Sequence, residues 1–220
     1  MIVVDGDDDH RYQPGSLLVP FGIHAPREVT RSRRKVLHRS ISLVYGDITR
    51  IDADANEVHL ANGSVLGYHT LMIATGVEPC PDQGPGLLGQ QWWRTIHEFY
   101  SYQGSVALAE ALRTWPGGRL VVHIADMPIK CPVAPLEFAF LADSYFRDRG
   151  IRDQVDLTYV TPLDAAFTKP IAARAFGTTL YIGASMWWRT SWSYASIPSA
   201  VPSLPSTRPR FPSISWSRSH

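Results

Sequence analysis

The residue best suited to chemistry is Cys131, which lies in the glycine-free loop ADMPIKCPVAP over 125–135. An apolar run over 119–125 predicts a strand before this loop, and an amphipathic pattern over 135–149 predicts a helix after it. Amide N–H groups at the start of a helix stabilise negative charge, so they favour the thiolate, the nucleophilic form of cysteine. A buried, inert thiol is the alternative. The position favours the nucleophile, and we take Cys131 as the candidate catalytic residue.

Two further positions are suited to binding a dinucleotide. Asp5 ends the apolar run MIVVD, and a carboxylate at the carboxyl end of a parallel strand can accept hydrogen bonds from ribose hydroxyls. Ala74, Thr75 and Gly76 follow a predicted strand over 68–74, where small residues let a ligand approach the backbone. The simpler alternatives are a solvated turn at Asp5 and a strand that ends on a glycine turn. The order of the two positions along the chain favours FAD.

Other reactive side chains have simpler interpretations. Cys80 lies in a proline-rich loop and is interpreted as a bystander. His10 follows three acidic residues, but successive side chains point in different directions and stay solvated, so we predict no metal site. Glu137 is either a proton acceptor or a charge that favours the start of the helix, and the second interpretation is the simpler one.

The elements that would position these residues alternate between strands and helices. Apolar runs over 41–67 predict a small β meander whose tight turn contains Asn62 and Gly63, and the basic stretch VTRSRRKVL predicts a helix that ends near His38. A further helix is predicted around 102–114. The strand over 119–125, the helix over 135–149 and a strand over 155–160 form a right-handed parallel crossover. The predicted fold class is therefore α/β.

Composition excludes several classes of function. The 220 residues carry 21 basic and 20 acidic side chains, and a formal charge of +1 gives no electrostatic case for binding nucleic acid. The start of the chain lacks the pattern of a signal peptide, and no apolar run is as long as a membrane-spanning helix. Two cysteines are too few for a disulfide scaffold. We expect a cytoplasmic protein.

The last part of the chain, 178–220, differs from the rest. It is rich in Ser, Pro, Trp and Arg and contains no Asp, Glu, Lys, Asn or Gln. Its apolar residues follow neither helical nor strand spacing, so we expect a low-complexity, disordered tail. The composition is what an out-of-frame reading of a GC-rich gene produces, and a frameshift near Ala175 is our hypothesis.

Several long strings resemble the sulfide:quinone oxidoreductase family of flavoproteins. They are HRYQPGSLLVPFG, TLMIATG, GGRLVVHIADMPIKCPVAPLEFAFLAD and DLTYVTPLDAAFTKP, and the resemblance runs from Met1 to about Arg174. It implies an FAD enzyme that oxidises sulfide at a cysteine and passes electrons through flavin to a membrane quinone, in peripheral contact with the inner face of the cell membrane. It also implies that Asp5 and Ala74–Gly76 hold FAD, and that Cys131 belongs to the redox pair that handles sulfur.

The resemblance implies a Rossmann-like flavoprotein with two dinucleotide-binding domains. We expect a partial FAD-binding domain over 1–80, which lacks the first strand and its glycine loop, and a second such region over 81–177. Because that glycine loop would bind the pyrophosphate, we expect FAD binding to be weak. A non-catalytic, truncated remnant is one alternative. A type II NADH:quinone dehydrogenase is another, although the loop over 125–135 lacks the glycines that a nicotinamide dinucleotide requires.

Overall fold

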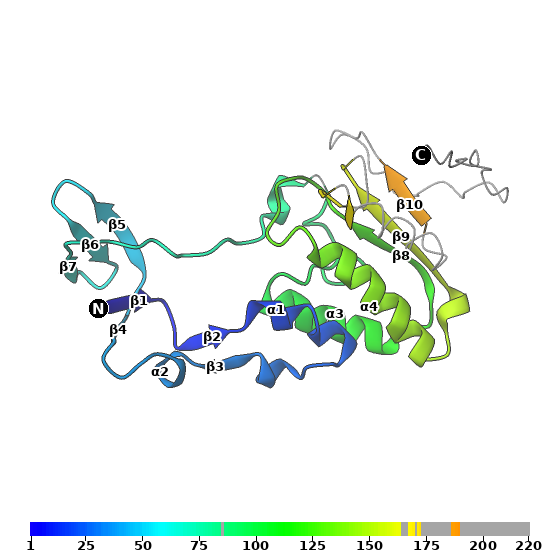
Figure 1. Cartoon of the computed structure of the whole chain (residues 1–220), viewed down its shortest axis with the longest axis horizontal. Coiled ribbons are helices and arrows are strands. Elements are labelled where there is room, and N and C mark those ends of the chain that lie inside the picture. The colour runs from blue at the N-terminus through cyan, green and yellow to red at the C-terminus, as the bar shows by residue number, and fades with distance from the viewer. Residues whose placement is uncertain (85, 164–166, 170, 173–185, 190–220) are drawn as a thin grey trace, which may run out of the picture.

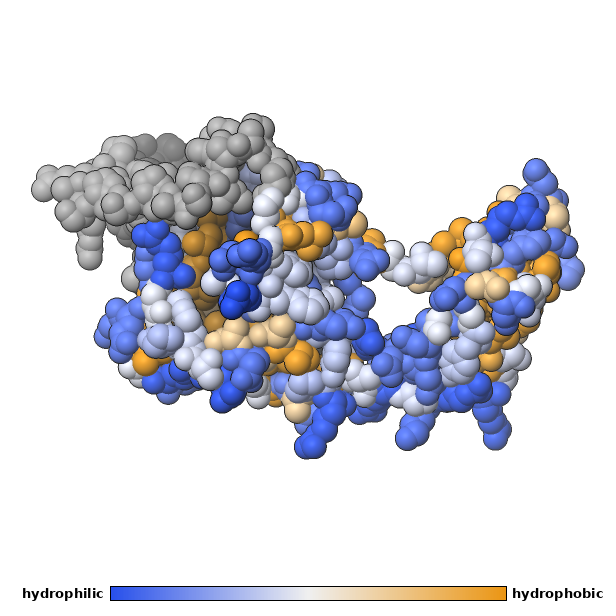
Figure 2. Space-filling model, turned by 180° about the vertical axis from the view of Figure 1, so that it is seen from behind, coloured by the Kyte–Doolittle hydropathy of each residue, from blue (hydrophilic) through white to orange (hydrophobic). Residues whose placement is uncertain are grey.

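The computed structural model describes residues 1–84, 86–163, 167–169, 171–172 and 186–189. It has two lobes, one made of strands and one made of helices packed beside a parallel sheet (Figure 1). Two separate connections join the lobes, and polar residues cover most of the visible surface of both (Figure 2). No described helix is both long and apolar enough to cross a membrane.

The smaller lobe consists of two small sheets. Its strands are β1 (Ile2–Asp5), β4 (Ser42–Tyr45), β5 (Ile48–Asp52), β6 (Glu57–Leu60) and β7 (Val65–Gly67). β5, β6 and β7 form an antiparallel meander, which confirms the predicted meander for 48–67. β4, at the start of the predicted meander, instead pairs in parallel with β1, which is the strand predicted to end at Asp5. In the turn between β6 and β7 only Gly63 has a positive φ (86°), and its N–H donates to the carbonyl of Leu60 at 3.0 Å.

The larger lobe contains the predicted crossover. Its elements are α3 (Tyr102–Thr114), β8 (Gly118–His123), α4 (Ala134–Asp148), η4 (Arg152–Gln154) and β9 (Val155–Thr161). β8 and β9 pair in parallel, which confirms the strand–helix–strand unit. The apolar face of α4 buries Leu136, Phe138 and Phe146 in the core of this lobe, and each such side chain contributes about 1.5–3 kcal/mol when fully buried.

The connection that contains α1 also supplies part of this core. β2 (Asp9–Arg11) pairs antiparallel with β3 (Thr30–Ser32), and between them lie α1 (Gln13–Ser16), η1 (Val19–Phe21) and η2 (Pro26–Glu28). The Phe21 ring lies 4.9 Å from that of Phe138 and 5.6 Å from that of Tyr145. Packing therefore crosses the predicted domain boundary at residue 80, which itself stays a prediction.

Two predicted elements differ from the structure. The predicted helix over 29–38 is strand β3 followed by one helical turn, α2 (Arg33–Val36), because Thr30–Ser32 pair with β2. The predicted strand over 68–74 is wrong: these residues form no strand, and Met72 and Ile73 are exposed. An apolar run becomes a strand only where a neighbouring strand satisfies its backbone N–H and C=O groups. No described strand lies paired with residues 68–74.

Most of the predicted disordered tail, 178–220, lies outside the described residues. Within it β10 (Met186–Arg189) is a strand that pairs in parallel with β9, so the structure differs from the prediction at these four residues. β10 can form because the edge of β9 opposite β8 would otherwise have unpaired backbone N–H and C=O groups. A short segment rich in tryptophan also has good strand propensity.

Candidate functional site

Cys131 lies between β8 and α4, as its neighbours in the sequence predicted. Its side chain is exposed and free of any disulfide. The residue has a φ of 49°, which is uncommon for any residue other than glycine, and its carbonyl accepts the N–H of Ala134 at 3.0 Å, where α4 begins. The predicted place of Cys131 before the amino end of the helix is confirmed, whereas its reactivity stays a prediction.

Tyr100 is the residue beside Cys131 that sequence reasoning missed. Its hydroxyl donates to the carbonyl oxygen of Cys131 across 3.4 Å, although 31 positions separate the two residues. Burial raises the pKa of Tyr100 above its ordinary value, and the nearby Cys131 raises it further. Nothing in the string that contains Tyr100 signals this contact, because it depends on how the residues before α3 pack against α4.

Glu137 and Cys80 lie where the sequence suggested. Glu137 is exposed in the first turn of α4, where an acidic side chain stabilises a helix. Cys80 is exposed, and its Sγ lies 3.6 Å from the carbonyl oxygen of Glu78. Cys80 and Cys131 form no disulfide, and the interpretation of Cys80 as a bystander stays a prediction.

Asp5 ends β1 as predicted, but its carboxylate is engaged by the chain itself. Arg33 Nη1 lies 3.0 Å from Asp5 Oδ2, and the Arg33 side chain is only 19% exposed. The same guanidinium donates to the carbonyls of Asp7 and Asp9 at 3.3 and 2.9 Å. The carboxylate that could accept ribose hydroxyls is therefore neutralised by an internal cation.

Ala74, Thr75 and Gly76 lie in the exposed connection between β7 and η3 (Pro81–Gln83). Gly76 has a φ of 78°, so a glycine is required there, but no described strand carries these residues toward β1. Together with the Asp5–Arg33 pair, this arrangement does not fit FAD. The described residues do not assemble a flavin cradle.

The acidic residues beside His10 serve the fold. Hydrogen bonds, first from Ser32 and then from Tyr45, lower the pKa of Asp8, and the same bond to Asp8 raises the pKa of Tyr45. Within the residues that the structure describes, no group of three or more His, Cys, Asp or Glu side chains could hold a metal ion.

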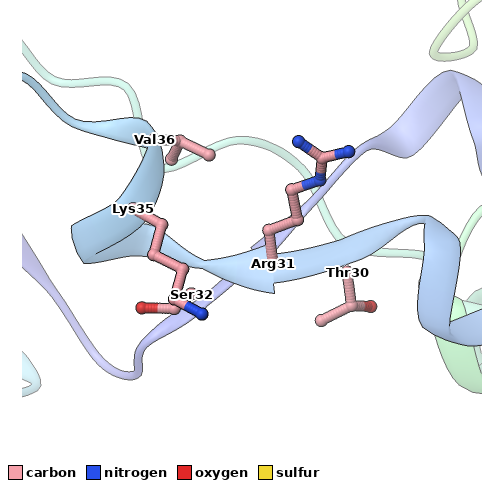
Figure 3. Close-up of a pocket in the computed structure, with 5 residues that line it drawn as sticks. All are labelled: Thr30, Arg31, Ser32, Lys35 and Val36. Carbon is pink, nitrogen blue, oxygen red and sulfur yellow. The ribbon is translucent and has the colours of Figure 1, made fainter.

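An open surface cleft of about 450 Å³ lies along β3 and α2. Figure 3 shows its lining residues, which are Thr30, Arg31, Ser32, Lys35 and Val36. It contains none of the residues predicted to do chemistry. It is lined by one short strand and one helical turn, whereas the thiol lies in the larger lobe.

The chain has relatives of similar sequence among known proteins. No family model matches the chain. The mitochondrial sulfide:quinone oxidoreductase of Dictyostelium discoideum is 26% identical over 160 residues, which are 72% of this chain and 35% of that protein. The Mus musculus enzyme of the same name is 25% identical over 165 residues, or 75% of this chain and 37% of that protein. The chain thus spans little more than a third of the curated relatives it matches.

The fold has a solved counterpart. The structure of the sulfide:quinone oxidoreductase from Aquifex aeolicus superposes with a TM-score of 0.72 and 18% identity, over 86% of this chain and 44% of that chain. The predicted α/β class and the predicted resemblance are confirmed. The chain is similar in sequence to the sulfide:quinone oxidoreductases and has the Rossmann-like fold of the FAD-dependent oxidoreductases.

Proposed function

We propose that the chain performs the sulfur-handling step of an FAD-dependent oxidoreductase of sulfide:quinone type, with Cys131 as the nucleophile. The observation that carries the proposal is the exposed Cys131 thiol, which lies in a tight turn before α4, in the loop that leaves the carboxyl end of the parallel strand β8. Ligands and reactive groups in open α/β sheets gather at this edge. In the complete reaction sulfide would be oxidised and its electrons would pass through flavin to a membrane quinone, in peripheral contact with the inner face of the cell membrane.

The surroundings of Cys131 support thiol chemistry more than dinucleotide binding. The Cys131 side chain is exposed to reagents, and the residue precedes the first turn of α4, whose N–H groups attract anions. The loop before α4 has no glycine, so its side chains hinder the close backbone approach that a pyrophosphate needs. This argues against an NADH:quinone dehydrogenase. We also propose that 1–80 and 81–177 correspond to the FAD-binding and second dinucleotide-binding regions of such an enzyme.

A second candidate is a non-catalytic homologue, and one observation favours it. Asp5 is paired with Arg33, and Ala74–Gly76 lie in an exposed connection, so the described residues that would hold flavin do not form its site. The two candidates differ in what Cys131 does. In the first it accepts sulfur, and in the second it is an ordinary surface thiol.

Sulfur transfer from inorganic polysulfide separates the two candidates. The Cys131 thiolate would attack the terminal sulfur of the polysulfide, the S–S bond would break, and a polysulfide shorter by one sulfur would leave with the bonding electron pair. We expect mass spectrometry of the full chain to find the extra sulfur on Cys131 at a rate about tenfold above that on Cys80, because the reaction follows thiolate content and access. The uptake should vanish in Cys131→Ser and persist in Cys80→Ser. Equal uptake at both cysteines would decide for the non-catalytic homologue.

A further inference from the structure

The carbonyl of Cys131 is the point where two separate parts of the larger lobe hold the cysteine. It accepts the N–H of Ala134 at 3.0 Å and the hydroxyl of Tyr100 at 3.4 Å. The first bond belongs to the local turn that starts α4. The second is a tertiary contact. A cysteine with a φ of 49° keeps that conformation only where its surroundings fix it, and both bonds act on this residue.

Tyr100 is itself fixed by the start of α3. Its backbone N–H donates to Glu98 Oε2 at 2.6 Å, and the same carboxylate accepts the N–H of Ser101 at 2.9 Å. Ser101 is the N-cap of α3, since its Oγ accepts the N–H of Gly104 at 2.9 Å. The backbone of Tyr100 is therefore tied to a capped helix rather than to a free loop.

The Tyr100 ring is held by α4 through a second aromatic ring. It stacks on Phe99 with a centroid distance of 5.0 Å and an interplanar angle of 18°. Phe99 in turn stacks on Phe138 of α4 at 4.8 Å and 9°. The hydroxyl that reaches Cys131 is thus carried by a ring whose position depends on both helices.

The hydroxyl of Tyr100 remains a donor over the whole range in which a thiol ionises. Burial, followed by the nearby Cys131, raises the pKa of Tyr100 above its ordinary value, so the group keeps its proton in alkaline solution. The contact with the Cys131 carbonyl is therefore available to both the thiol and the thiolate.

We propose that Tyr100 is a positioning residue for Cys131, which holds the cysteine in its tight turn before α4 so that the thiolate stays beside the first amides of the helix. This rests on the proposed function of Cys131. The hydroxyl makes no contact with sulfide, sulfur or the thiol in this role. It acts through the backbone of the cysteine.

The experiment is a pH profile of alkylation in the full chain. Iodoacetamide is the probe, and peptide mass spectrometry follows each cysteine from about pH 6 to about pH 10, where thiols ionise. Tyr100→Phe should slow alkylation of Cys131 about two- to tenfold near neutral pH, the equivalent of one net hydrogen bond. The pH at which the Cys131 rate reaches half its maximum should move upward. The profile of Cys80 should not change.

Two further variants separate positioning from general loosening. Tyr102→Phe removes a hydroxyl from the first residue of α3, and it should leave the Cys131 profile as in the wild type. Glu98→Gln weakens the anchor of the Tyr100 backbone and should move the Cys131 profile in the direction of Tyr100→Phe. An unchanged Cys131 profile in Tyr100→Phe would overturn the role of Tyr100, whatever the profile of Glu98→Gln.

The proposed function fails in a different way from this inference. If Cys131 of the wild type takes up sulfur from polysulfide no faster than Cys80, the proposed function is wrong and the role of Tyr100 falls with it. If Cys131 takes up sulfur faster than Cys80 but Tyr100→Phe leaves the alkylation profile of Cys131 unchanged, only the positioning role is wrong.

Discussion

Arg33 determines what the carboxylate of Asp5 can do. The guanidinium pairs with Asp5 at 3.0 Å and donates to two backbone carbonyls of the acidic loop that follows β1. A carboxylate in such a pair has less capacity to accept ribose hydroxyls. The sequence placed Asp5 correctly at the end of a strand, but its partner is 28 positions away. The acidic run over 7–9 and the basic run over 31–35 could have indicated an ion pair. Because the basic run was interpreted as a helix, the pairing of β2 with β3, which brings Arg33 to Asp5, was not predicted.

Arg33→Ala should destabilise the chain, because it leaves Asp5 and the carbonyls of Asp7 and Asp9 without this donor. We expect the free energy of unfolding to fall by about 1–3 kcal/mol, the usual range for hydrogen bonds that involve a charged group. Urea denaturation measures it. Arg39→Ala, at an exposed position, is the control and should change stability by less than about 0.5 kcal/mol. Equal stability of the two variants would show that the Arg33 contacts contribute nothing.

At the scale of elements, the crossover was predictable and the isolated runs were not. β8, α4 and β9 each carry a strong pattern, and each satisfies its backbone within the helix or between adjacent strands. The run over 68–74 has an equally apolar pattern, but a strand depends on a partner that the pattern does not contain. β10 is the opposite case, since the free edge of β9 supplied a partner to a segment whose spacing predicted no strand.

The end of α4 predicts a pH dependence of stability. Asp143 lies 2.8 Å from Arg147 Nε and 2.5 Å from Arg152 Nε. Burial alone would raise the pKa of Asp143, but the hydrogen bonds from the two arginines outweigh it, and the pKa is lowered. Because the folded state has the lower pKa, Asp143 contributes stability above the pKa of the unfolded chain, about pH 4, and loses it as the pH falls further.

Asp143→Asn checks this contribution. At neutral pH the variant should be less stable than the wild type, and the difference should shrink below about pH 4 as the native carboxylate takes up its proton. Thermal or urea unfolding at several pH values measures it. Asp148→Asn, at an exposed position of the same helix, should keep the pH dependence of the wild type. A difference between wild type and Asp143→Asn that stays constant with pH would contradict the assignment.

At the scale of the whole molecule, the two predicted sites have different requirements. The thiol site is built by one strand–helix unit and one capped helix, all within the larger lobe (Figure 1). The flavin site would need β1 of the smaller lobe together with the connection that contains Ala74–Gly76, and these do not meet at a common strand edge among the described residues. We therefore predict that the larger lobe carries the thiol site on its own and that these residues do not bind flavin.

The absorption spectrum of the purified full chain, incubated with FAD and then desalted, tests this prediction most directly. With Asp5 held by Arg33 and Ala74–Gly76 in an exposed connection, several hydrogen bonds to the cofactor are lacking, and each is worth about 0.5–1.5 kcal/mol, or more where a charge takes part. We predict that no flavin band remains after desalting, while Cys131 still takes up sulfur faster than Cys80. A flavin band near stoichiometric occupancy would contradict the account, because it would show that the chain forms the flavin site after all.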